Sequence, residues 1–217
     1  ATTATLRGRL GDAVRPIGCR WPVPQSSPFR SGAGMSHVFA IQAMFPVPDG
    51  TWVSPFLNSK DSQSDLPFDL LDGFSVAAGV IEPNTRSRIH VMPFVAQVTF
   101  VRSGVLIVRT KGPSDTAPRS LRLVAGQAVL TEPGEFFQLV NEQATPTEVL
   151  YIVSPAYVFD MGPNGELRFD DAVVLTESWE DLAAADLRMR VPMPTAEQRN
   201  EALRRIRATK QAASRGP

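Results

Sequence analysis

Residues 95–111 read VAQVTFVRSGVLIVRTK, two runs rich in β-branched residues that are joined by Ser103-Gly104. In the first run, Val98 and Phe100 fall on one face and the residues between them on the other, as in a half-buried β-strand. We therefore predict two adjacent strands with a tight hairpin at Ser103-Gly104.

Similar short runs recur along the middle of the chain, separated by Gly, Pro, Asn and Asp. The strands that we expect span residues 38–44, 73–82, 87–91, 95–102, 104–111, 119–124, 127–131, 136–141 and 147–153. A single sheet cannot bury so many apolar positions, so the pattern predicts an all-β domain of two packed sheets or a closed barrel.

Three segments follow from this pattern. Residues 1–34 combine prolines, serines and glycines, and we expect a proline-rich arm. Residues 35–160 form the predicted β-barrel. Residues 161–217 form a C-terminal extension with a turn, a strand-like run and two helices. Capping boxes mark the expected helix starts, at Ser178 with Asp181 and at Thr195 with Gln198.

Composition narrows the function classes. The 217 residues carry 22 Lys+Arg against 22 Asp+Glu, so a nucleic-acid partner is not expected. The second predicted helix has a basic face, for which a solvated surface or a subunit contact is the plainer alternative to nucleic-acid binding. The apolar runs are too short for a membrane helix, and we expect a cytoplasmic homodimer with a small-molecule ligand.

Two residue counts limit the chemistry further. The single cysteine, Cys19, cannot form an internal disulfide bond. The two histidines, His37 and His90, exclude any site that needs three imidazoles from one chain.

The most informative polar stretch is EPNTRSRIHVM, residues 82–92, followed by further Gly, Pro and Gln residues. In spacing and strand context, residues 73–153 resemble the two signature motifs of the cupin family. That family's first motif runs Gly, five residues, His-x-His, three or four residues, Glu, six residues, Gly. Its second runs Gly, five residues, Pro-x-Gly, two residues, His, three residues, Asn. The resemblance implies a cupin-like jelly-roll β-barrel.

Most of the family's metal ligands are replaced in this chain. In the first motif, the positions from Gly to Gly are taken by Asn84, His90, Met92, Gln97 and Gly104. In the second, Pro133 matches, Glu135 replaces the Gly, and Gln138 stands at the His. In that register Gly126 lies one residue too far from Pro133, and Asn141 one residue too close to Gln138.

Two interpretations of this ligand set stay open. In one, His90, Gln97 and Gln138 hold iron, manganese, zinc or, with the soft thioether of Met92, copper, in an oxygenase or isomerase with His90 as ligand or general base. In the other, the barrel is metal-free and senses or binds an organic molecule. Gln97 and Gln138 would then orient the ligand, and Met92 would line the wall. Under either interpretation we expect the four side chains to point into one cavity, which His37 could join.

Neighbouring residues offer further candidates, each with a structural alternative. Arg86 and Arg88 alternate and so share a face, either as a clamp for a substrate carboxylate or as surface ion pairs. Glu132 and Glu135 are expected to be solvated loop charges. Phe136-Phe137 places one ring in the core and the other outward, toward a subunit interface. A third possibility for the whole chain is a structural role in assembly.

Overall fold

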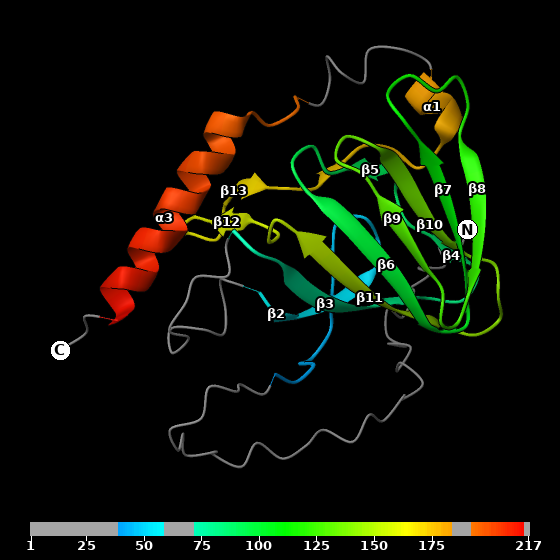
Figure 1. Ribbon diagram of the computed structural model, residues 1–217, viewed down its shortest axis with the longest axis horizontal. Helices are drawn as coiled ribbons and strands as arrows, with labels where there is room; N and C mark the ends of the chain where they lie inside the picture. Colours follow the sequence, from blue (N-terminus) through cyan, green and yellow to red (C-terminus); the bar gives the residue numbers. More distant parts are fainter. Residues whose placement is uncertain (1–38, 59–71, 184–191, 215–217) are drawn as a thin grey trace, which may run out of the picture. The chain divides into compact units, whose positions relative to one another are not determined.

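The structure is a computed structural model that describes residues 39–58, 72–183 and 192–214 (Figure 1). The predicted arm, with Cys19, and His37 lie outside the described residues. The strands are β1 (Phe45–Pro46), β2 (Trp52–Leu57), β3 (Ser75–Ile81), β4 (Thr85–Arg86), β5 (His90–Val91), β6 (Ala96–Ser103), β7 (Val105–Lys111), β8 (Arg119–Val124), β9 (Ala128–Thr131), β10 (Phe136–Asn141), β11 (Thr147–Ser154), β12 (Phe159–Met161), β13 (Leu167–Asp170) and β14 (Val173–Val174). The helices are α1 (Trp179–Ala183) and α3 (Ala196–Ser214).

The strands form two main antiparallel sheets. One has the order β1-β2-β3-β11-β6-β9 and the other β14-β5-β10-β7-β8, with β4 also paired to β10. From β3 to β11 the chain passes repeatedly from one sheet to the other, which leaves β3-β11-β6-β9 facing β5-β10-β7-β8. This is the strand order of a double Greek-key jelly roll, so the expected all-β jelly-roll fold is confirmed.

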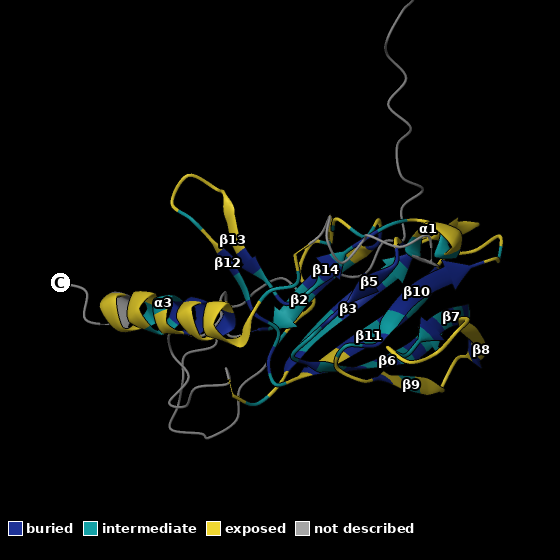
Figure 2. Cartoon of the chain, turned by 90° about the horizontal axis from the view of Figure 1, so that it is seen from above, coloured by how far each residue is buried: buried dark blue, intermediate teal, exposed yellow. Residues whose placement is uncertain are grey.

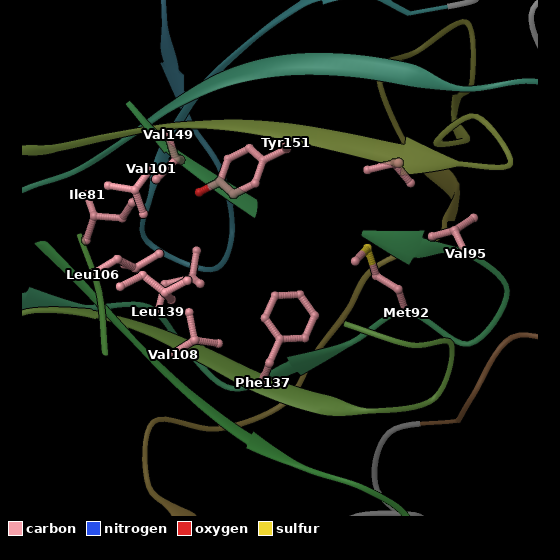
Figure 3. Close-up of a cluster of buried hydrophobic side chains, with 12 residues drawn as sticks. Ile81, Met92, Val95, Val101, Leu106, Val108, Phe137, Leu139, Val149 and Tyr151 are labelled. Carbon is pink, nitrogen blue, oxygen red and sulfur yellow. The ribbon is translucent and has the colours of Figure 1, made fainter. Parts of the chain in front are cut away.

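The main apolar core lies between the sheets. Val101 and Val149 reach it from one sheet, and Leu106, Val108 and Leu139 from the other, all nearly inaccessible to solvent (Figure 3). In β6, β7 and β11 buried residues alternate with more exposed ones, as the period-2 pattern predicts.

Gly104 connects the two sheets, so the predicted hairpin is wrong. β6 pairs with β11 and β9, whereas β7 pairs with β10 and β8. Gly104 has φ +84°, and a Cβ there would lie 2.9 Å from Oγ1 of Thr147 and 3.2 Å from the Pro146 carbonyl oxygen. The sequence correctly predicts a turn at Ser103-Gly104, but a turn does not determine whether the strands on either side of it pair with each other.

Substituting Gly104 with alanine is expected to destabilise the fold by about 2–4 kcal/mol, because backbone strain at positive φ adds to the contact with Thr147. Gly126 is the matched control, with φ +86° and nothing within 4 Å of an added Cβ. Urea denaturation of G104A and G126A measures the difference. Equal losses in the two variants would contradict the close approach of Thr147.

The N-terminal strand prediction also needs correction. Residues 39–44 form no strand, and the chain instead forms β1 and the unpredicted β2. β2 contains Pro55, which lacks a backbone donor and coincides with a shift of register against β3. Proline in the run is the reason that pattern reasoning passed over this strand.

The C-terminal extension is part of the jelly roll. β14 pairs with β5, and the boundary expected at residues 160/161 falls inside β12. The predicted turn at Asn164-Gly165 connects β12 and β13, which pair with each other. Of the pair Phe136-Phe137, for which one inward and one outward ring were expected, Phe136 is the ring outside the main core, and it packs against Val91 of β5 and against Val173 and Leu175 of this extension.

Both predicted helices are present with their capping boxes. The amide of Asp181 donates to the Ser178 hydroxyl, and Thr195 and Gln198 exchange backbone-to-side-chain bonds at the start of α3. Along α3 the buried residues recur at helical spacing, at positions 199, 202, 203 and 206 (Figure 2). Ala202, Leu203 and Ile206 pack against Val158 and Phe169.

The basic face of α3 is largely occupied by ion pairs within the chain. Arg199, which is buried, pairs with the fully buried Asp171, while Arg205 pairs with Asp160 and Arg207 with Asp72. These ion pairs engage three of the arginines of this face within the chain, and the absence of a nucleic-acid partner stays a prediction. No helix among the described residues has the length and apolar character needed to cross a membrane. The homodimer stays a prediction.

Candidate functional site

A cavity of about 440 Å³ lies within the jelly roll. Its walls are mostly apolar and include Val53, Ala77, Leu139, Val153 and Phe159. Six polar side chains that matter for its chemistry also line it: Asp49, His90, Gln97, Tyr151, Tyr157 and Asp170. A mainly apolar cavity with a few convergent polar groups is typical of a small-molecule site.

His90 is held in one orientation on β5 and is 6% exposed. Its Nδ1 lies 3.0 Å from the Arg88 carbonyl oxygen, and the ring centroid lies 3.9 Å from that of Phe137. A carbonyl can only accept, so the neutral ring is assigned its proton on Nδ1, which leaves a lone pair on Nε2. His90 can therefore accept a proton or a hydrogen bond from a ligand.

The loop between β1 and β2 brings Asp49 to His90. One carboxylate oxygen of Asp49 accepts from the amide and hydroxyl of Thr51, at 2.9 and 2.8 Å, and the other lies 3.9 Å from Nδ1 of His90. The Asp49 carbonyl also accepts from the Arg88 amide at 2.7 Å. Sequence reasoning missed Asp49, although Pro48-Asp49-Gly50 is a strong turn signal.

Tyr151 on β11 is a second cavity residue that sequence reasoning missed, as it also missed Tyr157 and Asp170. It is 7% exposed, and its hydroxyl has no hydrogen-bond partner among the described residues. The Thr51 hydroxyl donates to Asp49 at 2.8 Å, and its interaction with the Tyr151 hydroxyl acts to lower the Tyr151 pKa without meeting the geometry of a hydrogen bond. Burial, with a smaller contribution from the Asp49 charge, raises the pKa of Tyr151 far above its ordinary value. The hydroxyl therefore keeps its proton and lacks an acceptor for it.

Gly79 fixes the position of the Tyr151 ring. A Cβ at Gly79 would lie only 2.3 Å from Cε2 of Tyr151, so the ring packs on bare backbone of the neighbouring strand. Figure 3 shows the hydroxyl between the two sheets. The sequence does contain a signal for Tyr151. The alternation in β11 places its phenol ring on the inward face of the strand, together with Val149 and Val153.

Tyr157 and Asp170 form a second polar pair on the wall, and this pair is satisfied. The Tyr157 hydroxyl donates to the Asp170 carboxylate, which also accepts from the Ala172 amide at 2.9 Å. Burial raises the pKa of both groups, and their mutual interaction raises that of Tyr157 further. The Tyr157 hydroxyl already has an acceptor, in contrast to that of Tyr151.

Three of the four expected cavity residues do share the cavity. His90, Met92 and Gln97 line it, and all are buried. The amide nitrogen of Gln97 donates to the Thr99 hydroxyl at 3.1 Å.

Gln138 is placed differently from the expectation and is not among the cavity-lining residues. It is fully buried, and its amide nitrogen donates to the carbonyl oxygens of Ser87 and Glu177 at 2.9 and 3.0 Å. Its amide oxygen accepts from Nε1 of Trp179 at 3.1 Å. Gln138 thus ties the C-terminal extension to β10, and the structure gives it no free polar group for a ligand or metal.

Phe137 occupies the inward position instead. It is fully buried, stands opposite His90 on the paired strand and contacts the imidazole ring. It lies eleven residues after Gly126 and four before Asn141, which is the family spacing for the His of the second motif, and Gly134 then falls on the motif's Gly. The one-residue mismatches of Gly126 and Asn141 in the Gln138 register were the signal for the Phe137 register. A shift of one residue along a strand moves each side chain to the opposite face of the sheet.

Three charged candidates also differ from expectation. Arg86 and Arg88 are exposed and do not line the cavity, so the proposed carboxylate clamp has no geometry there. Glu135 is 7% exposed rather than solvated. It accepts from the Thr110 hydroxyl and from Arg119 at 3.1 Å, which secures the turn before β10.

The donor set does not fit a divalent metal. The inward positions of the two motifs carry one imidazole, one thioether, one neutral amide and a phenyl ring, in His90, Met92, Gln97 and Phe137. Within the described residues, no group of three or more His, Cys, Asp or Glu side chains converges as a metal site. Iron, manganese and zinc favour imidazoles and carboxylates, so the expected set of His90, Gln97 and Gln138 is not assembled here.

No family model matches the sequence, and no curated protein matches it. The strand order and the signature spacing agree with each other. The fold is cupin-like.

Solved structures similar to this chain include cupin domains. The Drosophila melanogaster CENP-C cupin domain is 14% identical with a TM-score of 0.42, covering 52% of this chain and 74% of that one. Oxalate decarboxylase from Lactobacillus farciminis is 16% identical with a TM-score of 0.45, covering 61% and 33%. Peruvianin-I from Thevetia peruviana, a cysteine peptidase, is 15% identical with a TM-score of 0.47, covering 63% and 74%. At these scores the neighbours' activities say nothing about this cupin-like chain.

Proposed function

We propose that this cupin-like chain binds a small organic molecule in the cavity between its sheets, without a metal ion. The observation that carries the proposal is the mostly apolar cavity of about 440 Å³, which has His90 and Gln97 on its wall. Burial of apolar ligand surface in such a cavity is favourable, and a few polar groups on the wall orient the ligand.

This proposal selects the metal-free binding interpretation over the oxygenase or isomerase that uses a metal. Gln138 is engaged elsewhere, and the remaining inward side chains are poor metal donors. The sensing or storage role needs only a cavity of suitable size and polarity. A volume of about 440 Å³ is ample, because a 150 Å³ apolar cavity already admits benzene.

A second candidate is metal-independent proton transfer by His90. The observation in its favour is the orientation of the imidazole, with Nδ1 held by the Arg88 carbonyl and the Asp49 carboxylate close by. A general base at His90 would exchange the α-protons of a bound ketone, such as 1-acetonaphthone, with deuterated water. Exchange no faster than in the H90A variant would remove this candidate.

Binding of the neutral dye N-phenyl-1-naphthylamine tests the main proposal, because its fluorescence rises in apolar sites. We expect saturable binding to the wild-type protein at one site per chain. Ala77, on β3, lines the cavity, and the A77F substitution is expected to fill part of it and reduce dye binding at least tenfold.

Ala128 provides the matched control for this experiment. It is exposed on β9 of the same sheet, so A128F introduces the same ring outside the cavity. The A128F variant is expected to bind the dye as the wild type does. Equal binding by A77F and the wild type would place the dye outside the cavity and contradict the proposal.

A further inference from the structure

We infer that the cavity selects an organic cation, a protonated amine on a mostly apolar body, over neutral and anionic molecules of similar shape. This inference rests on the proposed function and specifies the ligand class for the same cavity. It follows from the charges on the cavity wall and from the polar atoms there that have no partner among the described residues.

The charged side chains on the cavity wall are acidic. Asp49 and Asp170 both line the cavity, whereas no lysine or arginine among the described residues does so. A carboxylate in a low-dielectric space is costly without a counter-charge, and a cation that enters the cavity supplies one. An anionic ligand would add a further negative charge to the same space.

The two carboxylates share one arrangement, in which the protein holds one oxygen and leaves the other open. Oδ1 of Asp49 accepts from the amide and the hydroxyl of Thr51. Oδ1 of Asp170 accepts from the Tyr157 hydroxyl and the Ala172 amide. Within the described residues no hydrogen bond reaches Oδ2 of either aspartate, and neither Oδ2 atom is fully buried. Each carboxylate is therefore fixed in place with one oxygen available to a ligand.

The neighbouring polar atoms on the wall are acceptors as well. His90 and Gln97 line the cavity and are 6% and 7% exposed. With Nδ1 of His90 on the Arg88 carbonyl, Nε2 has no partner among the described residues. The Gln97 amide nitrogen donates to Thr99, which leaves Oε1 in the same condition. An alkylammonium group has N–H donors and no acceptor, so its hydrogen bonding matches this wall better than that of a hydroxyl or a carboxylate.

A metal ion does not fit the same description. Within the part of the chain that the structure describes, no three His, Cys, Asp or Glu side chains converge as a metal site, so Asp49, His90 and Asp170 do not form one coordination sphere. An ammonium group needs contact with only one carboxylate, and the charge of the other adds to the attraction. The negative wall is therefore suited to a cation that is carried on an organic body.

The rest of the wall suits an apolar body. Val53, Ala77, Leu139 and Val153 provide apolar contacts, and Phe159 adds an aromatic ring, the face of which attracts cations. Burial of apolar ligand area contributes favourably to the binding free energy. A bicyclic aromatic amine combines both features.

Three ligands of similar shape test the inference: 1-naphthylmethylamine, 1-naphthalenemethanol and 1-naphthoic acid, titrated calorimetrically into the full chain. Near pH 8 the amine and the acid are both charged, so the three ligands differ mainly in the charge of the head group. We expect the amine to bind at least about tenfold more tightly than the alcohol, and the acid to bind more weakly than the alcohol.

The D49N and D170N substitutions remove the two wall charges. Asparagine keeps an Oδ1 acceptor for the donors that now bind each aspartate, so the local structure is expected to survive. We expect each variant to weaken amine binding about threefold or more, and D49N/D170N to bind the amine and the alcohol within about twofold of each other. E142Q removes an exposed carboxylate outside the cavity, and this control should leave the preference for the amine unchanged.

The outcomes separate this inference from the proposed function. An amine that binds no more tightly than the alcohol, or a preference for the amine that D49N/D170N retains, overturns the inference and leaves the proposed function standing. Failure of all three ligands and of the naphthylamine dye to bind the folded wild-type protein overturns both.

Discussion

Replacing Asp171 with alanine is expected to lower the free energy of unfolding by about 3–5 kcal/mol, because it leaves the Arg199 guanidinium buried without a counter-charge. Asp171 is fully buried, and its carboxylate accepts from Nε and Nη2 of Arg199 at 2.8 and 3.1 Å. It also accepts from the Val158 amide at 2.8 Å. Urea denaturation followed by circular dichroism measures the loss.

The double variant D171L/R199M is the control for this experiment. It removes both charges together, so most of the stability lost in D171A is expected to return even though the ion pair is absent. The Ala156 carbonyl, which accepts from Arg199 at 3.0 Å, then loses its donor, and recovery is incomplete. A loss below about 1 kcal/mol in D171A would contradict the description of α3 as anchored by this pair.

The second large effect is expected at Gln138. The Q138L substitution removes the donor to the buried Ser87 carbonyl oxygen, the donor to the Glu177 carbonyl oxygen in a part-buried bond, and the acceptor of the Trp179 indole. At about 1–3 kcal/mol for each buried group left unpaired, a total loss of roughly 3–5 kcal/mol is expected. Chemical denaturation measures it, while dye binding by the remaining folded molecules is expected to be unchanged.

Gln97 is the control for Gln138, because it is also a buried glutamine but lines the cavity. Its amide makes a single described hydrogen bond, to Thr99, so Q97L is expected to cost little stability but to alter dye binding. If Q138L altered dye binding and Q97L did not, the assignment of the two glutamines would be reversed.

Most of the fold could be predicted from local pattern. The runs 119–124 and 136–141 coincide with β8 and β10, because period-2 alternation and flanking turn residues act within a few positions. The chain's crossing at Gly104 could not be predicted in this way. A turn signal fixes the backbone of a few residues, whereas β6 pairs with partners about fifty positions away in β11 and β7 with partners about thirty positions away in β10.

The candidate site was also predicted only in part, because local spacing identifies some of its residues and strand pairing brings in the others. His90, Met92 and Gln97 were placed correctly in the cavity because one motif with fixed spacing carries all three. Gln138 was placed on the wrong face because a single-residue choice of register decides which way a strand residue points. Tyr151 and Asp49 belong to neither motif, and only the three-dimensional pairing of the strands brings them to His90.

Thermal denaturation of the wild type, A77F and A128F, each with and without saturating N-phenyl-1-naphthylamine, tests the central claim most directly. The dye should raise the unfolding temperature of the wild type and of A128F by the same amount, because it binds the folded protein. It should stabilise A77F less, because the introduced ring fills part of the cavity. Equal stabilisation of A77F and the wild type would contradict the account.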